Sequence, residues 1–361
     1  QFGALLIEVQ DLNSLSEKPF IFPEDMDKLH NLQRFKLVLP IKNIISRKQI
    51  SLADSIRREI YNFFMKPRGD FSFMEILSWL IFEKYKTKSL STYKLGNSPI
   101  DGKEVILNVN DMTPEYTFET TDGLIYLTDI FRLHEAVDEE FGASGILGYV
   151  LRLIEQIIIV YSIRYLLKYA KEKLSKFLFI ADGPLSFSGQ TANMHKPLRE
   201  LCNFLNKNET LNFVGIEKSG PFVDHAQAIC IPHEGKVILE KGKYLILSND
   251  YIYHYILPGD SKIMHYGSTS YYSGKIIFHS LDDQIIVLSI PTESKDIILN
   301  PQKNNFQNID VILKNIQKLK CDMYDDSIVP IALANKLVSL ANHPSQTLLE
   351  KFASSKLSKS T

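Results

Sequence analysis

Cysteine is scarce in this chain, and none of it lies in a pattern that forms disulfides or binds metal. The 361 residues include three cysteines, Cys202, Cys230 and Cys321, with no Cys-x-x-Cys pair. An odd and widely spaced set argues against a disulfide framework and against a zinc site. We therefore expect a protein of a reducing compartment, and we predict the cytoplasm.

The sequence also lacks an excess of charge and an uninterrupted apolar run. Lys and Arg number 41 and Asp and Glu number 42, so any contact with nucleic acid has to come from a local basic patch. The most apolar stretch, residues 146–169, is interrupted by Arg152, Glu155, Arg164 and Lys168. These are too many charges for a bilayer span, so we expect a buried helix and no membrane partner.

Motifs of nucleotide and ester hydrolysis are missing as well. The sequence holds no P-loop, no Gly-x-Ser-x-Gly and no dinucleotide-binding fingerprint. Their absence argues against ATP hydrolysis and against serine hydrolase chemistry.

Apolar periodicities along the chain are typical of an α/β fold. Strands are expected at residues 3–9, 35–39, 105–109, 177–181, 211–216, 244–247, 275–279 and 284–290, and helices at 51–64, 73–85, 128–141, 144–173, 196–206, 309–317 and 329–340. The unbroken apolar run 177–181 predicts a strand covered on both faces, as at the centre of an α/β sheet. We expect one domain over 1–345, with 86–123 as an inserted loop region and 346–361 as a flexible tail.

Asp182 is the sharpest candidate for chemistry. It follows the apolar strand 177–181 and precedes Gly183, at the strand end where open α/β sheets bind their ligands. Glycine lets a phosphate approach the backbone closely because it has no Cβ. The alternative is that Asp182-Gly183-Pro184 forms an ordinary turn.

Glu155 lies in an apolar helix, where a carboxylate is costly to bury unless it is paired or bound to metal. Arg152, three residues earlier, offers the alternative of an ion pair. Glu155 precedes Asp182 by 27 positions (182 − 155), and a helix packed beside the following strand would bring the two carboxylates together. Two carboxylates without cysteine suit Mg²⁺ or Mn²⁺, which activate water for phosphodiester cleavage.

Three further segments carry weaker signals. Lys218, at the end of strand 211–216, is a candidate phosphate contact, although a solvated lysine is the commoner case. The aromatic segment 266–275 suggests base stacking or cross-strand packing. The pair Arg57-Arg58 suggests either a DNA contact or a solvated helix face.

Six segments, spread along almost the whole chain, together resemble the pattern of a known family. They are Tyr126–Glu135, the helix with Glu155, Phe179–Leu185, Val214–Gly220, Tyr266–Lys275 and Val329–Lys336. In this order they resemble the NurA domain family of DNA nucleases. The resemblance rests on the order of the segments, since no single one of them is decisive.

The resemblance implies a ribonuclease-H-like α/β fold, with a mixed central sheet flanked by helices and with inserted and C-terminal helical elements. It implies a homodimer that cuts DNA with Mn²⁺ or Mg²⁺ and a HerA-like hexameric ATPase that feeds DNA to it. The family's metal site uses an Asp in an early Asp-Gly-Ser strand, a helical Glu and a later Asp. Glu155 matches the second of these ligands and Asp182 the third.

Two departures from the family pattern bear on activity. No Asp-Gly-Ser occurs in the sequence, so we expect the first catalytic strand and its metal ligand to lie upstream of Gln1. The family's C-terminal Ala-His pair reads Ala334-Asn335 here. Asparagine orients water or substrate but cannot act as acid or base.

We therefore expect a metal-dependent DNA exo- or endonuclease that works with a HerA-like translocase in DNA end resection or in defence against phage. Its site would comprise Asp182, Glu155, Lys218 and Asn335. One alternative is a catalytically inactive subunit that regulates or caps the ATPase hexamer. Another is a nucleic-acid-binding module without chemistry.

Overall fold

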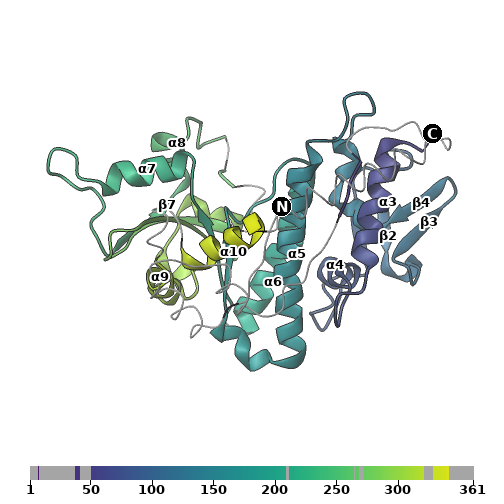
Figure 1. Cartoon of the computed structure of the whole chain (residues 1–361), viewed down its shortest axis with the longest axis horizontal. Coiled ribbons are helices and arrows are strands. Elements are labelled where there is room, and N and C mark those ends of the chain that lie inside the picture. Colours follow the sequence, from purple (N-terminus) through teal and green to yellow (C-terminus); the bar gives the residue numbers. More distant parts are fainter. Residues whose placement is uncertain are drawn as a thin grey trace.

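The computed structural model describes residues 7, 37–40, 50–208, 211–263, 265–267, 272–320 and 328–340. These residues form a mixed α/β protein with a five-stranded mixed sheet, two small antiparallel hairpins and surrounding helices (Figure 1). The sheet lies with α7 to α10 on one side of the long helices α5 and α6, and α3, α4 and the hairpins lie on the other side.

The main sheet has the strand order β5-β6-β9-β8-β7. Its strands are β5 (Leu178–Asp182), β6 (Asn212–Glu217), β7 (Lys243–Leu247), β8 (Tyr272–His279) and β9 (Ile285–Pro291). β5 pairs with β6 in parallel, and every other pairing is antiparallel. Because β5 and β6 are parallel, their carboxyl ends lie at the same edge of the sheet.

The two faces of the sheet are buried by different helices. Val214, Ile216 and Leu288 belong to a core cluster with apolar residues of α9 (Ile309–Gln317) and α10 (Val329–Leu340). The opposite face packs its alternate residues against α7 (Pro221–Cys230) and α8 (Asn249–Tyr255). Side chains alternate between the faces of a strand, so one strand serves both clusters.

The third and largest core cluster is mainly helical. It joins α3 (Leu52–Met65), α4 (Phe73–Ile81), α5 (Ile146–Tyr169) and α6 (His195–Asn208). The start of α4 is fixed by a capping box: Ser72 Oγ accepts from the Glu75 amide at 3.1 Å, and Glu75 accepts from the Ser72 amide at 2.6 Å. Such a box satisfies amides at the helix end that have no partner within the helix.

Short elements fill the region between α4 and α5 and the connections of the sheet. The hairpins are β1 (Thr92–Leu95) with β2 (Val105–Asn108) and β3 (Thr117–Thr120) with β4 (Gly123–Tyr126). The 3-10 helices are η1 (Val109–Asp111), η2 (Leu127–Phe131), η3 (Leu133–Ala136), η4 (Lys171–Lys176), η5 (Gly189–Met194), η6 (Lys295–Leu299) and η7 (Lys303–Asn305).

Helix α5 is the one helix among the described residues that is long and apolar enough to cross a membrane. In the protein it packs against α4 and α6, and 44% of its most apolar 18-residue window is buried. We interpret α5 as a core helix of the folded domain. Part of its length lies at the protein surface, so the prediction of a buried helix is right only in part.

Several expectations from the sequence are confirmed. Helices 309–317 and 329–340 are α9 and α10, and the three predicted strands between 244 and 290 are β7, β8 and β9. The mixed α/β class is confirmed with them. The expected single domain over 1–345 stays a prediction.

Other expectations are wrong. In the sheet formed by the described residues, β5 is the edge strand and not a central one. The prediction that this strand is covered on both faces is confirmed, because Phe179 packs on the helical cluster and Ile180 packs on the α9 cluster. The helix expected at 128–141 is two 3-10 turns, and α7 and α8 were not predicted.

The predicted N-terminal strands and C-terminal tail fall mostly outside the described residues. A strand was predicted at 35–39. Residues 37–39 of it are described, and they form no strand. Of the strand predicted at 3–9, only Ile7 is described, and it has no regular structure. The tail 346–361 lies outside the described residues.

Candidate functional site

The carboxyl ends of β5 and β6 hold an ion pair between two predicted site residues. Asp182 is the last residue of β5 and pairs in register with Ile216, two residues before Lys218. Lys218 Nζ donates to Asp182 Oδ2 at 2.7 Å. The Asp182 side chain is 44% exposed, so it faces solvent at the strand end and is accessible to a ligand.

Helix α5 brings a second carboxylate and a second cation to the same place. Arg152 Nη1 lies 3.3 Å from Glu155 Oε2, one helical turn away, and donates to the backbone oxygen of Asp182 at 3.3 Å. Arg152 therefore joins the helix to the end of β5. The ion pair considered as an alternative for Glu155 is present, and Asp182 is near enough to raise the pKa of Glu155.

The charge environment of Glu155 reflects this arrangement. Burial raises the pKa of Glu155, Arg152 lowers it, and the negative charge of Asp182 raises it further. The Glu155 side chain is 33% exposed, so it is half-buried. Added positive charge near the two carboxylates would therefore favour the ionised form of Glu155.

Two glycines allow the backbone to pack tightly beneath the site. Gly183 has a φ of +102°, and its amide donates to the Ile216 carbonyl at 2.6 Å. A Cβ on Gly183 would lie 3.0 Å from Arg152 Nη2, and a Cβ on Gly215 would lie 2.5 Å from the Gly183 oxygen. Gly183 and Gly215 thus let β5, β6 and Arg152 approach one another closely, because neither glycine has a Cβ.

A buried ion pair lies beside the site on the opposite face of β6. Lys275 of β8 pairs with Glu217, and their side chains are 0% and 11% exposed. Lys275 Nζ lies 3.9 Å from the centre of the Phe222 ring on α7. Burial lowers the pKa of Lys275, and Glu217 acts against that shift.

The pair of Lys275 with Glu217 was not predicted from the sequence. The aromatic segment 266–275 was expected to stack bases or to pack across strands, but Tyr266 packs against Phe222 of α7 with ring centres 5.2 Å apart. Lys275 is fully buried and faces no solvent. A lysine at an inward position of the apolar strand 275–279 was the available signal, because such a charge needs a partner.

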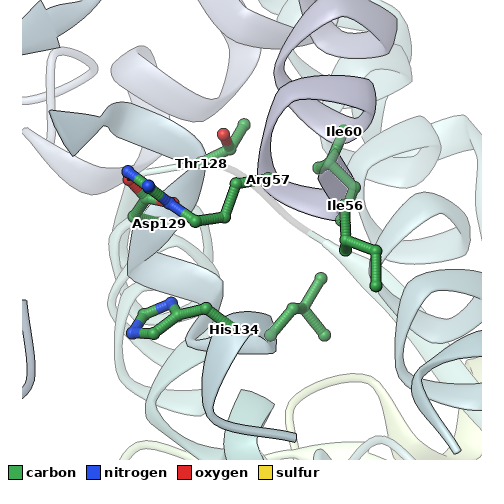
Figure 2. A pocket seen from close by; sticks show the side chains of 7 residues that line it. Ile56, Arg57, Ile60, Thr128, Asp129 and His134 are labelled. Carbon is green, nitrogen blue, oxygen red and sulfur yellow. The ribbon is translucent and has the colours of Figure 1, made fainter. Parts of the chain in front are cut away.

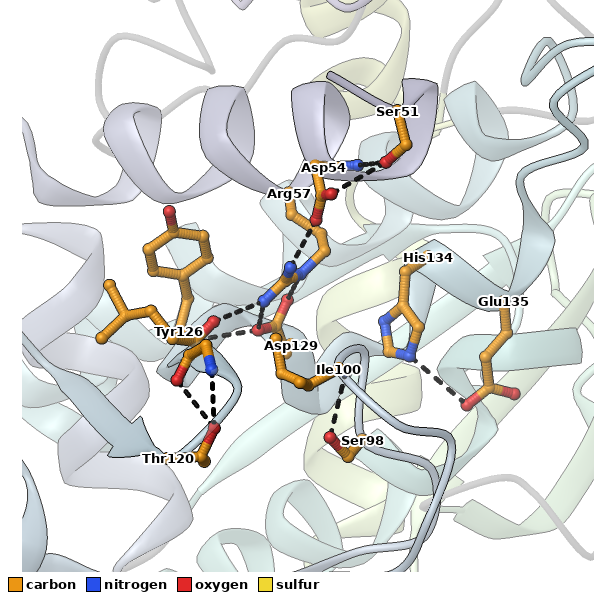
Figure 3. Close-up of polar contacts among 12 residues, drawn as sticks. Ser51, Asp54, Arg57, Ser98, Ile100, Thr120, Tyr126, Asp129, His134 and Glu135 are labelled. Carbon is orange, nitrogen blue, oxygen red and sulfur yellow. Dashed lines mark hydrogen bonds and ion pairs between the residues drawn. The ribbon is translucent and has the colours of Figure 1, made fainter. Parts of the chain in front are cut away.

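The segment Tyr126–Glu135 forms a polar cluster that is structural (Figures 2 and 3). Arg57 donates from Nε and Nη2 to the two oxygens of Asp129 at 2.8 and 2.7 Å, and Nη2 also donates to the Leu124 carbonyl. The Arg57 and Asp129 side chains are 6% and 2% exposed. Arg57 is therefore no DNA contact, and only Arg58 of the predicted basic face is exposed.

A small pocket lies beside this polar cluster, and Figure 2 shows the side chains that line it. His134 lines it together with Ile56, Ile60, Thr128 and the Arg57–Asp129 pair. Burial lowers the pKa of His134. The buried imidazole therefore favours its neutral form in the folded protein.

The remaining predicted residue, Asn335, is exposed on α10. Its role in orienting water or substrate stays a prediction. Among the described residues there is no group of three or more His, Cys, Asp or Glu side chains that could hold a metal ion. The described part of the predicted metal site is the carboxylate pair Glu155 and Asp182.

Comparisons of the chain with known protein families, with characterised proteins and with solved structures gave no match.

Proposed function

We propose that this protein is a metal-dependent nuclease that hydrolyses DNA phosphodiester bonds. The observation that carries the proposal is the meeting of Asp182, Glu155, Arg152 and Lys218 at the carboxyl ends of two parallel strands. Ligands of open α/β sheets bind at this edge. The two carboxylates suit a metal ion, and the two cations beside them suit the phosphate oxygens of a nucleic acid.

The donor chemistry fits Mn²⁺ or Mg²⁺. Asp182 and Glu155 supply hard oxygen donors, and a cation between them would relieve the unfavourable burial of Glu155. Mg²⁺ in phosphoryl-transfer sites is commonly held by one or two carboxylates, with water and substrate phosphates completing its shell. When bound, the metal would supply a water of lowered pKa and positive charge near the leaving oxygen.

The residues of this chain have separate tasks in the proposed site. Asp182 and Glu155 would hold the metal. Arg152 orients the Glu155 carboxylate and anchors the end of β5 through the Asp182 carbonyl. Lys218 exchanges part of its contact with Asp182 for a contact with a DNA phosphate, and Asn335 orients water or substrate.

The finer assignment is to the NurA family, on the strength of the six segments in order. It brings with it a ribonuclease-H-like fold, a homodimer, a HerA-like hexameric ATPase as partner, and a role in end resection or phage defence in the cytoplasm. The pairing of Lys218 with Asp182 supports this assignment, because it unites the segments Phe179–Leu185 and Val214–Gly220.

A second candidate is a catalytically inactive subunit that caps or regulates the ATPase ring. Specific observations favour it. Each carboxylate already has a cation of its own, Arg152 for Glu155 and Lys218 for Asp182, and Asn335 stands where the family has a histidine. An inactive subunit needs no metal to hold such a cluster together.

A Mn²⁺ titration of the full-length protein separates the two candidates. The nuclease proposal expects saturable Mn²⁺ binding that Asp182→Ala weakens at least tenfold. The matched control is Asp310→Ala, which breaks the exposed Asp310–Lys303 pair of 2.8 Å far from the site. Binding that is absent, or equally affected by both substitutions, favours the inactive subunit.

A further inference from the structure

The end of α5 and the following turn η4 carry an unusual concentration of positive charge. Residues 164–176 contain five basic side chains and one acidic side chain, Glu172, whereas the whole chain has 41 basic and 42 acidic residues. With two tyrosines these basic residues form what we call the α5 basic surface, which consists of Arg164, Tyr165, Lys168, Tyr169, Lys171, Lys173 and Lys176.

The tyrosines of the α5 basic surface are exposed and lie close to one of its cations. The residues Tyr165 and Tyr169 are 44% and 51% exposed, and their ring centres are 4.9 Å apart. Lys168 Nζ lies 4.8 Å from the Tyr169 ring centre and 5.0 Å from that of Phe71. Two large aromatic rings thus face solvent among positive charges.

Arg164 anchors this surface to the core. Its guanidinium lies 4.1 Å from the Phe71 ring centre and donates to the Glu75 carbonyl at 2.9 Å. Burial lowers the pKa of Arg164, and this side chain serves packing more than solvent contact. The lysines and tyrosines beyond it are the accessible part of the surface.

We propose that the α5 basic surface binds single-stranded DNA, with its lysines on phosphates and its tyrosines stacked on bases. Aromatic rings interleaved with cations are how proteins hold single strands without reading sequence. The inference rests on the proposed nuclease function, because it assigns this surface to the substrate of that site.

The α5 part of this surface and Glu155 lie on the same helix. Thirteen residues separate Glu155 from Lys168, which corresponds to about 20 Å along a helix axis. Tyr169, fourteen residues after Glu155, lies within about 40° of it around the helix at 3.6 residues per turn. Lys168 lies about 140° from Glu155 around the helix, so the surface and the candidate site are related by their distance along α5 and not by a shared face.

Binding of a fluorescent oligothymidylate in EDTA tests the surface apart from cleavage. The full chain with Lys168, Lys171, Lys173 and Lys176 all changed to Gln is compared with a matched variant in which the exposed Lys88, Lys236, Lys243 and Lys262 are changed to Gln. The first variant should bind at least tenfold more weakly, with a salt slope smaller by up to about 3. The second should bind as the unaltered protein does.

The tyrosines are tested in the same assay. Tyr165→Ala and Tyr169→Ala should each weaken binding by about tenfold, with the salt slope unchanged, because stacking releases no counterions. All four lysines and both tyrosines are exposed, so thermal unfolding should stay unchanged and report intact folding.

The inference is overturned if the two quadruple variants bind alike, or if vesicles of anionic lipid compete better than DNA for the surface. Failure of the nuclease proposal looks different. In that case Asp182→Ala changes neither cleavage nor metal binding, while oligothymidylate binding still depends on the lysines of α5.

Discussion

Lys218 Nζ lies 2.7 Å from Asp182 Oδ2, across the paired ends of β5 and β6. A cation of the chain thus occupies one side of the carboxylate that we assign to metal. Lys218 therefore both competes with the metal and stands ready for a phosphate. The two effects of its removal have opposite signs.

Lys218→Ala is expected to raise the affinity for Mn²⁺ a few-fold and to lower the rate of DNA cleavage by about tenfold to a hundredfold. The metal gains because a competing positive charge has gone, and cleavage loses a phosphate contact. Mn²⁺ titration and single-turnover cleavage measure the two effects. Lys303→Ala, which breaks the exposed pair with Asp310, is the control. A variant that loses metal affinity and cleavage together contradicts this role.

Glu155 makes the folded protein gain stability as the pH falls. Burial raises its pKa above the ordinary 4.5, so the folded state takes up a proton before the unfolded state does. Stability should therefore rise as the pH falls through the raised value towards 4.5. Glu155→Gln should be more stable than the unaltered protein at pH 7, with the difference shrinking towards pH 4.5 in urea unfolding. Saturating Mn²⁺ should reduce the difference at pH 7.

His134 makes the folded protein lose stability as the pH falls. Burial lowers its pKa below the ordinary 6.5, so the unfolded state takes up a proton first as the pH falls. Its contribution to stability is present above pH 6.5 and is lost as the pH falls from 6.5 towards the lowered value. Thermal unfolding at pH 7.5 and pH 5.5 should show a smaller drop for His134→Leu than for the unaltered protein. His233→Leu, at an exposed position, should show the full drop.

The Arg57–Asp129 pair is expected to support the fold and not the reaction. Asp129→Ala leaves the Arg57 guanidinium buried without its main partner, which costs about 3–5 kcal/mol in such pairs. Chemical unfolding measures the loss. Asp310→Ala, an exposed pair, should stay within about 0.5 kcal/mol of the unaltered protein. If Asp129→Ala folds with full stability but does not cleave DNA, this cluster belongs to the site.

Local pattern was enough to predict the helices α9 and α10, because their apolar faces repeat with the helical period and each ends near a polar break. It did not predict α7, which begins at Pro221. The proline lies in the first turn of the helix, where its missing amide costs nothing, so it marked a helix start.

The site could be predicted only in outline. Glu155 could be found from the sequence because it is a charged residue in an apolar helix. Asp182 and Lys218 could be found because they follow the ends of predicted strands. The second contact of Arg152, to the Asp182 carbonyl, depends on how α5 packs against β5. The partnership of Glu217 with Lys275 depends on the strand order β6-β9-β8, which no local pattern contains.

Mn²⁺-dependent degradation of linear and single-stranded DNA by the protein, with and without the proposed HerA-like ATPase, tests the central claim most directly. The account predicts cleavage that requires the metal and that Asp182→Ala abolishes, while Asp310→Ala cleaves normally. Absence of cleavage under every condition, with the ATPase complex still forming, would contradict the nuclease and leave an inactive partner subunit.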